Sequence, residues 1–302
     1  MTAALPRQRP LFALLIRLAA MVALSTMALF VKLASESGIH IAEILFWRQF
    51  ITLPLLGGWL ALTGQAMLFT TRRPGMHAKR AAYGMTGMVL IFTALTLLPL
   101  AEATVFNFTS TIWAVILSVF LLREKVGRYR WLAVILGFTG VLVIAQPGGG
   151  NINLAGAAAA LGGAFMVALI SIQIRDMNRT EHQLTIVFYF AAFSAPVLLC
   201  FMPFVFAPHD MYQWLVIAGL GLSGLAGQVL LTLSLRFGAV ASVIVMDYSS
   251  LIWATLFGLL VFGNIPPVAT WFGAPLIVVA GLIIAYREHK LSIARDVPPA
   301  AA

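Results

Sequence analysis

The feature that most constrains this chain is a series of long intervals without an ionisable side chain. Five of them run for 20 to 26 residues between charged or histidine residues, namely 49–71, 81–101, 103–122, 183–208 and 211–235. A helix needs about 20 residues, at about 1.5 Å of rise each, to cross about 30 Å of hydrocarbon. Each interval therefore predicts one membrane-spanning helix.

Two further intervals, 131–174 and 248–286, are long enough for two helices each. Clusters of glycine and proline interrupt them at 146–151 and 263–267, and such clusters end helices. With a first helix near the N-terminus, the sequence predicts an all-α integral membrane protein with ten transmembrane helices. Their approximate ranges are 12–35, 41–62, 78–98, 101–122, 130–146, 153–175, 182–206, 212–236, 239–262 and 268–287.

The composition excludes other classes of protein. Only 10% of the residues are charged and 61% are hydrophobic, whereas a soluble domain has about 25% charged residues. A soluble enzyme and a disordered chain are therefore excluded. The net charge of +9 would suggest nucleic acid in a soluble protein, but here it is expected from basic loops on the cytoplasmic side of a membrane. We expect the lipid bilayer as a partner and no nucleic acid.

The distribution of Lys and Arg predicts the orientation. With the N-terminus inside, 17 of the 19 Lys and Arg residues fall in the inner segments, and Lys32 and Arg48 fall within helices. The predicted outer loops carry acidic residues instead, namely Glu36, Glu43, Glu102 and Asp210. Cytoplasmic loops of membrane proteins are rich in Lys and Arg. We therefore expect a multi-pass protein of the cell inner (cytoplasmic) membrane with both termini cytoplasmic.

The two halves of the chain share a local repeat at an offset of 140 residues. Residues 101–114 align with 241–254, with identities that include Ser110/Ser250 and Trp113/Trp253. Because five helices are an odd number, the second copy enters the membrane from the opposite side, which is typical of secondary transporters. We therefore expect two inverted five-helix repeats as domains, residues 1–150 and 151–302.

Several motifs resemble the EamA-type drug/metabolite transporter family. They are Leu121-Leu122-Arg123-Glu124-Lys125-Val126, Trp131-Leu132-Ala133, Gly137-Phe138-Thr139-Gly140-Val141, Ala101-Glu102-Ala103-Thr104, Phe46-Trp47-Arg48, Phe262-Gly263 and Ala280-Gly281. The chain departs from the family at Arg123-Glu124, where Gly-Glu is frequent, and at Asn264, where Glu is frequent. The resemblance implies a ten-helix carrier for small metabolites, with amino-acid exporters among the more similar members.

Polar and aromatic residues within the predicted helices are the candidates for substrate binding, because ionisable groups in a bilayer need a partner or a wet cavity. Asp247 has no basic residue within one helical turn, so we expect it to bind a substrate ammonium group or a coupling proton. Arg48 pairs with Glu43 or a helix carbonyl, or faces the cavity and attracts a carboxylate. Lys32 either reaches the outer surface or faces the cavity and attracts a substrate carboxylate. The candidate residues are Asp247, Asn107, Trp113, Trp253, Tyr248, Ser110, Ser250, Arg48, Lys32, Tyr83, Gln173 and Gln228.

The predicted path lies between the halves and is lined by the helices near 12–35, 78–98, 101–122, 153–175, 212–236 and 239–262. Small residues at four-residue steps predict close packing seams in two of them, Gly156 to Ala168 and Gly219 to Gly227. The five histidines lie near helix ends and receive no role. The single cysteine, Cys200, offers no disulfide.

These features predict a secondary transporter that moves amino acids with aromatic or other apolar or neutral side chains, as an exporter working by alternating access. The first alternative is a carrier for S-adenosylmethionine or for nucleoside-like or drug-like cations. The second is a membrane-embedded enzyme, although the sequence contains no catalytic cluster and no metal spacing. A channel is a further alternative. We expect no cofactor, and we expect a monomer whose coupling ion is a proton.

Overall fold

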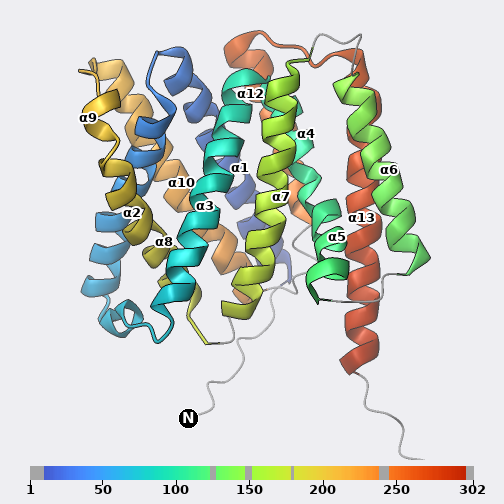
Figure 1. Cartoon of the computed structure of the whole chain (residues 1–302), viewed down its shortest axis with the longest axis horizontal. Coiled ribbons are helices and arrows are strands. Elements are labelled where there is room, and N and C mark those ends of the chain that lie inside the picture. Colours follow the sequence, from blue (N-terminus) through green and yellow to red (C-terminus); the bar gives the residue numbers. More distant parts are fainter. Residues whose placement is uncertain (1–9, 123–126, 147–151, 178–179, 238–244, 297–302) are drawn as a thin grey trace, which may run out of the picture.

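The computed structural model describes residues 10–122, 127–146, 152–177, 180–237 and 245–296 as a bundle of helices, with no strand among them. The elements are α1 (Pro10–Glu36), α2 (Ile41–Leu62), η1 (Ala66–Phe69), α3 (Pro74–Leu97), α4 (Leu100–Phe108), α5 (Ser110–Leu122), α6 (Arg128–Ala145), α7 (Leu154–Met177), α8 (Gln183–Leu199), α9 (Met202–Val205), α10 (Met211–Phe237), η2 (Val245–Ser249), α12 (Ser250–Phe262) and α13 (Val268–Asp296). Figure 1 shows the long helices side by side. The all-helical prediction is confirmed for these residues.

Eight segments of the described chain are long and apolar enough to cross a membrane, and α4 and α5 together make one of them. Two further apolar segments, Gln183–Leu199 and Met246–Phe262, are shorter than the others. The prediction of ten crossings therefore stays a prediction. The motif at 123–126, the residues 147–151 and the first four residues of the second repeat copy lie outside the described residues.

Two predicted helices are interrupted at positions that are 140 residues apart. The expected helix 101–122 divides at Thr109 into α4 and α5, and the described part of 239–262 divides at Ser249 into η2 and α12. Thr109 Oγ1 donates to Phe106 O at 2.6 Å, and Ser249 Oγ donates to Met246 O at 2.6 Å. A hydroxyl that bonds to the carbonyl three residues earlier competes with the α-helical ladder. The same local chemistry thus accompanies both interruptions.

Proline explains two further differences from the predicted helix ends, whereas α13 continues nine residues beyond its expected end at 287. The expected helix 182–206 ends as α8 at Leu199 and resumes as the short α9, which has Pro203 in its first turn. The helix expected at 78–98 begins earlier, because Pro74 occupies its first position. Proline is favoured there, since its missing N–H would be unbonded in any case. Gly263, with φ +64°, ends α12 as the glycine–proline cluster predicts.

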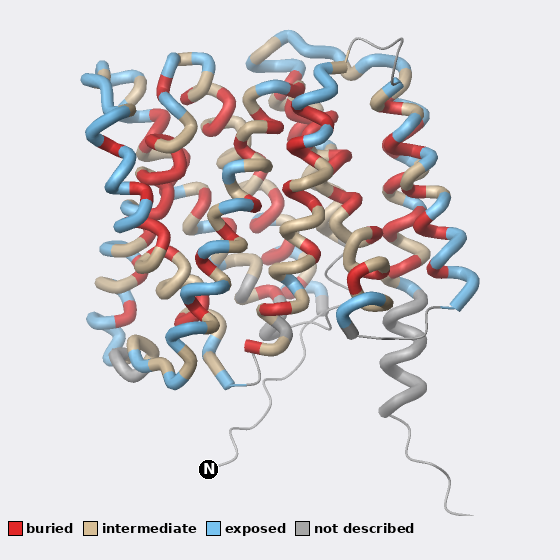
Figure 2. The backbone as a smooth tube through the Cα atoms, in the orientation of Figure 1, coloured by how far each residue is buried: buried red, intermediate tan, exposed pale blue. Residues whose placement is uncertain are grey.

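Close helix pairs are built on the predicted small-residue seams. The helix α1 packs along α10, and α3 packs along α7. A Cβ atom added at Gly219 would collide with the ring of Phe30, and one added at Gly156 would collide with Leu98. In α7, Ala160, Ala164 and Ala168 are all buried. Both seams are confirmed as packing surfaces. Figure 2 shows buried residues along the faces where helices meet and exposed residues along their outer faces.

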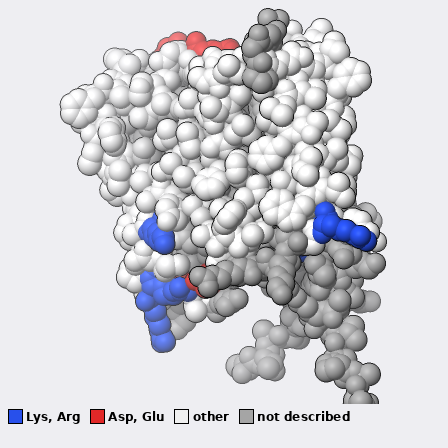
Figure 3. Space-filling view, turned by 45° about the vertical axis from the view of Figure 1, so that its right-hand side comes forward, with Lys and Arg blue, Asp and Glu red and all other residues white. Residues whose placement is uncertain are grey.

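Charged side chains mark the two ends of the bundle. Figure 3 shows Lys and Arg near the lower end with a small area of Asp or Glu beside them, Asp and Glu at the upper end, and neither kind on the visible surface between them. We call the end with Arg72, Lys79 and Arg128 the basic end, and the end with Glu36 and Asp210 the acidic end. The side chains on the belt between them include exposed Ile135, Leu142, Trp271 and Phe272. An exposed apolar belt of this kind suits contact with lipid.

Candidate functional site

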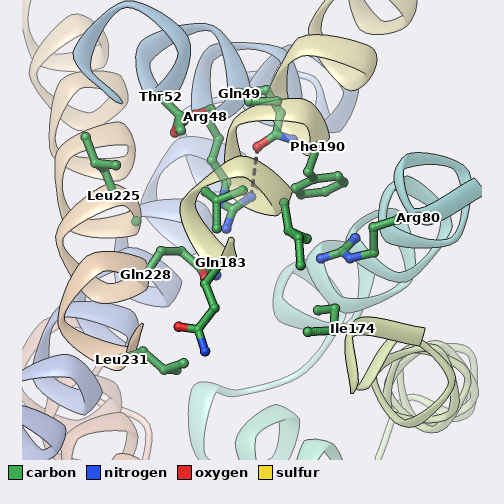
Figure 4. Close-up of a pocket in the computed structure, with 14 residues that line it drawn as sticks. Arg48, Gln49, Thr52, Arg80, Ile174, Gln183, Phe190, Leu225, Gln228 and Leu231 are labelled. Atoms are coloured by element: carbon green, nitrogen blue, oxygen red, sulfur yellow. Dashed lines mark hydrogen bonds between the residues drawn. The ribbon is translucent and has the colours of Figure 1, made fainter. Parts of the chain in front are cut away.

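A cavity of about 170 Å³ lies between helices from both parts of the chain. It is lined by residues of α2, α3, α7, α8 and α10. The lining residues are Arg48, Gln49, Thr52, Arg80, Ile174, Gln183, Ile186, Val187, Phe190, Ala191, Gly224, Leu225, Gln228 and Leu231. Figure 4 shows the side chains of Arg48 and Arg80 reaching toward the same space from α2 and α3. We call this cavity the arginine pocket.

Arg48 is buried in the pocket wall without a carboxylate partner among the described residues. The residue is only 8% exposed. Its guanidinium donates to Gln49 Oε1 at 3.0 Å and otherwise contacts the sulfur atoms of Met27 and Met88 at 3.4 and 3.1 Å. A thioether sulfur is only a weak acceptor. The guanidinium therefore keeps most of its capacity to bind an anion.

The alternative that Arg48 pairs with Glu43 is wrong. Glu43 Oε1 lies 2.6 Å from His209 Nε2 and also accepts a hydrogen bond from Trp47 Nε1 at 3.1 Å. Glu43 lies in the first turn of α2, at the acidic end, whereas Arg48 lies more than one turn deeper. Glu43 therefore belongs to the contacts at the acidic end, whereas Arg48 belongs to the wall of the arginine pocket.

Arg80 is the second cation of the pocket. Its guanidinium lies over the ring of Phe190, 4.4 Å from the centroid, which is a cation–π contact. The Nε and Nη1 atoms are buried and have no hydrogen-bond partner in the described chain. Gly84 makes room for this arrangement, because a Cβ there would collide with both Arg80 and Phe190.

All buried polar side-chain atoms of the pocket residues that lack a hydrogen-bond partner are donors. They are Nε and Nη1 of Arg80 and Nε2 of Gln49. The orientation of the Gln49 amide follows from Arg48, because a guanidinium only donates and so requires the amide oxygen on its side. No Asp or Glu is among the lining residues. A ligand that satisfies this pocket must supply acceptors.

Of the candidates predicted from the sequence, Arg48 and Gln228 line the arginine pocket. Asp247 lies elsewhere, in η2, and the expectation that it lacks a nearby cation is wrong. Arg17 Nε and Nη2 each donate to one of its carboxylate oxygens at 2.6 Å. Arg17 lies on α1, 230 residues away in the sequence, so that no local sequence pattern predicts this ion pair.

Lys32 does not reach the outer surface, because the residue is only 6% exposed. Its Nζ donates to the carbonyls of Leu95 and Leu98 at 3.3 and 2.9 Å, and it lies over the ring of Phe262. The carbonyls at the end of a helix lack intrahelical partners. Lys32 therefore caps the end of α3 and is not among the pocket-lining residues.

The other candidates lie on the interrupted helices or on the paired helices α3 and α7. Trp113 packs edge-on against Phe138 and Phe165, and Tyr248 packs against Phe108. The indole nitrogens of Trp113 and Trp253 and the amide oxygen of Asn107 are buried without a partner in the described chain. The Ser250 hydroxyl bonds to the backbone of η2. Ser110 begins α5, Tyr83 contacts Lys79, and Gln173 donates to Met76 O. None of these residues lines the arginine pocket.

The pocket lining also differs from the expected path. The helices α8 and α10 contribute most of the lining residues and α2 contributes three, whereas α1, α4 and η2 contribute none. Of these contributors, α2 and α8 were not among the expected helices. Arg80 was not among the candidate residues, because it lies at the inner end of the expected helix 78–98 and was grouped with the inner Lys and Arg residues. Pro74 was the available signal, because a helix that begins there places Arg80 almost two turns inside α3.

Contacts join the two parts of the chain at both ends of the bundle. At the acidic end, the buried Glu43–His209 pair joins α2 to the segment before α10, and Gln213 Nε2 donates to Ser37 O at 2.9 Å. At the basic end, Arg73 pairs with Asp176 at 2.9 Å and Thr71 donates to Glu181 at 2.8 Å. His209 thus has a structural partner that the sequence analysis did not foresee. No group of three or more potential metal ligands occurs in the described part of the chain.

A membrane-type helical bundle around a polar cavity is the form of a solute transporter rather than of a soluble binding protein. The chain belongs to the EamA-like transporter family, whose model matches residues 11–146 and 154–286. This confirms the resemblance seen in the motifs, and the protein is a membrane transporter of that family.

Several relatives have names that state what they carry. The chain is 28% identical to a riboflavin transporter of Vibrio cholerae, over 85% of this chain and 87% of that protein. It is 28% identical to the pseudopaline exporter CntI of Pseudomonas aeruginosa, over 85% and 89%. It is also 28% identical to an S-adenosylmethionine uptake transporter of Rickettsia prowazekii, over 83% and 85%. A crystal structure with 23% identity has the same fold, with a TM-score of 0.62 over 93% of this chain and 98% of the other.

Proposed function

We propose that this protein is a secondary carrier for small metabolites that bear a carboxylate, foremost amino acids with apolar or aromatic side chains. It exports them across the cytoplasmic membrane by alternating access and works as a monomer. The observation that carries the proposal is the arginine pocket, whose unpartnered polar atoms are all donors.

The energetics of buried charge support a carboxylate as the bound group. A charged side chain in the middle of a bilayer costs about 2.5–3.5 kcal/mol on insertion scales, so its retention calls for a function or a partner. Arg48 has only sulfur and amide contacts. A guanidinium binds a carboxylate through two parallel hydrogen bonds. The apolar walls at Ile186, Val187 and Leu225 suit the side chain of the solute.

The same pocket disfavours the cationic alternative. S-adenosylmethionine and drug-like cations need a carboxylate or an aromatic cage near their positive charge. The lining contains two arginines and no acidic residue. A net cation in this pocket would meet repulsion from both guanidinium groups.

The arrangement of the helices supports alternating access between two inverted repeats. Suppose that α1 corresponds to α7 in the other repeat, and that α3 corresponds to α10. The packing of α1 against α10 is then the counterpart of the packing of α7 against α3. The breaks at Thr109 and Ser249 follow the same correspondence. A pocket between such repeats, with pairs between the two parts at both ends, suits a carrier whose ends open in turn. The relatives have both exporter and uptake names, so that export in this chain rests on the motifs.

Counterflow in liposomes tests the proposal. Purified protein is reconstituted with unlabelled L-phenylalanine inside, and uptake of labelled L-phenylalanine is measured with and without competitors. We expect saturable counterflow that L-phenylalanine abolishes and that phenethylamine, which lacks only the carboxylate, does not affect. Inhibition by phenethylamine as strong as that by L-phenylalanine would contradict the carboxylate site, and equally strong inhibition by S-adenosylmethionine would contradict the exclusion of net cations. Flux without saturation would indicate a channel, and chemical conversion of the solute would indicate an enzyme.

Cysteine labelling tests the proposed orientation. In a Cys200→Ser background, we expect Asp210→Cys to react with an impermeant thiol reagent added outside intact cells. We expect Arg128→Cys to react only after the cells are permeabilised. Both positions are exposed in the structure and lie at opposite ends of the bundle. Labelling of Arg128→Cys in intact cells would reverse the orientation.

A further inference from the structure

The two guanidinium groups of the arginine pocket occupy separate levels along α3. The Nη1 atom of Arg80 lies beside Gly84, where a Cβ would collide with it. The Nη1 atom of Arg48 lies 3.1 Å from the sulfur of Met88. Gly84 and Met88 are four residues apart on the same helix, which separates their Cα atoms by a rise of about 6 Å. A carboxylate that makes a two-pronged contact with one guanidinium does not make a second such contact with a guanidinium at another level, so the pocket offers two anion positions.

We propose that the arginine pocket selects solutes with two anionic groups about one helical turn apart, the chemistry of short dicarboxylates such as acidic amino acids. The α-carboxylate binds at Arg48 and the second anionic group binds at Arg80. This inference rests on the proposed function, because it keeps the carboxylate at Arg48, and it extends the substrate class to solutes with a second anionic group.

Charge balance supports a second anionic group. Like charges in a medium of low dielectric repel each other strongly, and the pocket residues contribute two positive charges and no negative one. A monocarboxylate neutralises one of them and leaves the other. A dicarboxylate without an ammonium group neutralises both, and an acidic amino acid neutralises one, whereas a zwitterion such as phenylalanine neutralises neither. The cavity of about 170 Å³ is below the range of about 300–1,000 Å³ found for drug-sized ligands.

The local packing around Arg80 holds its guanidinium toward the pocket. The ring of Phe190 lies under one face of the guanidinium, and Gly84 leaves space beside it. The neighbouring Lys79 differs, because it is exposed and lies over Tyr83, outside the pocket lining. Lys79 thus provides a cation at nearly the same depth for a matched comparison.

L-Glutamate and L-glutamine test the proposal, because they have nearly the same size and differ in the second negative charge. Their inhibition of L-phenylalanine counterflow is measured for the reconstituted wild-type protein, Arg80→Gln, Arg80→Lys and Lys79→Gln. We expect glutamate to inhibit the wild type at least tenfold more strongly than glutamine. Arg80→Gln should reduce this ratio to about one, whereas Arg80→Lys should retain part of it and Lys79→Gln all of it.

The outcomes separate this inference from the proposed function. Counterflow of phenylalanine in the wild type with equal inhibition by glutamate and glutamine would overturn the two-anion site and leave the carrier intact. Absence of counterflow with both phenylalanine and glutamate would overturn the proposed function as well. A melting temperature of Arg80→Gln in detergent close to that of the wild type shows that the variant is folded. An unchanged glutamate preference in that variant would also overturn the inference. It would indicate that Arg80 binds another anion, such as a lipid phosphate.

Discussion

Replacing Arg48 with glutamine is expected to weaken transport of L-phenylalanine by about 10- to 100-fold while leaving the protein at least as stable as the wild type. Hydrogen bonds to a charged group contribute about 1.5–3 kcal/mol, which corresponds to that loss of affinity. The buried guanidinium has no carboxylate partner among the described residues, so that its removal relieves a desolvation cost. Counterflow kinetics and thermal unfolding in detergent measure the two effects.

The substitution Arg48→Lys is the matched control for charge. An ammonium keeps the positive charge but does not form the two-pronged contact with a carboxylate. We expect intermediate transport and no gain in stability. A fall in the melting temperature of Arg48→Gln with unchanged transport would make Arg48 a structural residue and would contradict its place in the solute site.

Replacing Asp247 with asparagine is expected to destabilise the protein by about 2 kcal/mol and to lower its expression. The change leaves Arg17 without its carboxylate, and the Arg17 side chain is only 6% exposed. Breaking a fully buried ion pair costs about 3–5 kcal/mol. The Asp247 side chain is 32% exposed, so that solvent screening reduces the expected cost. Thermal unfolding of the purified variant measures it.

The double variant Arg17→Gln/Asp247→Asn shows whether the pair acts as a unit. Two neutral amides leave no unpaired charge, so we expect the double variant to be more stable than Asp247→Asn alone. If instead Asp247→Asn has wild-type stability and lacks transport, Asp247 acts on the solute or on a proton, as the sequence alone suggested.

The positions of most helices could be predicted because the bilayer excludes charge. Intervals such as 211–235 are free of ionisable residues and correspond closely to single helices, here α10 (Met211–Phe237). The same rule explains why Arg80 was not predicted as a site residue, because it lies at the inner end of the expected helix 78–98 and was grouped with the inner Lys and Arg residues. Its guanidinium instead lies over Phe190 inside the bundle. Charge predicts where helices end only when the charged residue has no internal role.

Contacts between distant segments could not be predicted in the same way. Asp247 and Arg17 are 230 residues apart, and Glu43 and His209 are 166 residues apart. Helical periodicity relates residues three or four positions apart and carries no information about such pairs. The repeat did align Thr109 with Ser249, but residue types alone do not show that both hydroxyls turn back onto the helix at 2.6 Å.

Solute protection of a cysteine at Thr52 tests most directly that the carboxylate binds in the arginine pocket. Thr52 lines the pocket on α2, and Thr63 is exposed at the end of the same helix. Both are changed to cysteine in a Cys200→Ser background, and the rate of thiol labelling of the reconstituted protein is measured. We predict that L-phenylalanine slows labelling at Thr52→Cys severalfold, that phenethylamine does not, and that neither affects Thr63→Cys. Equal labelling of Thr52→Cys with and without L-phenylalanine, in a variant that still transports it, would contradict the account.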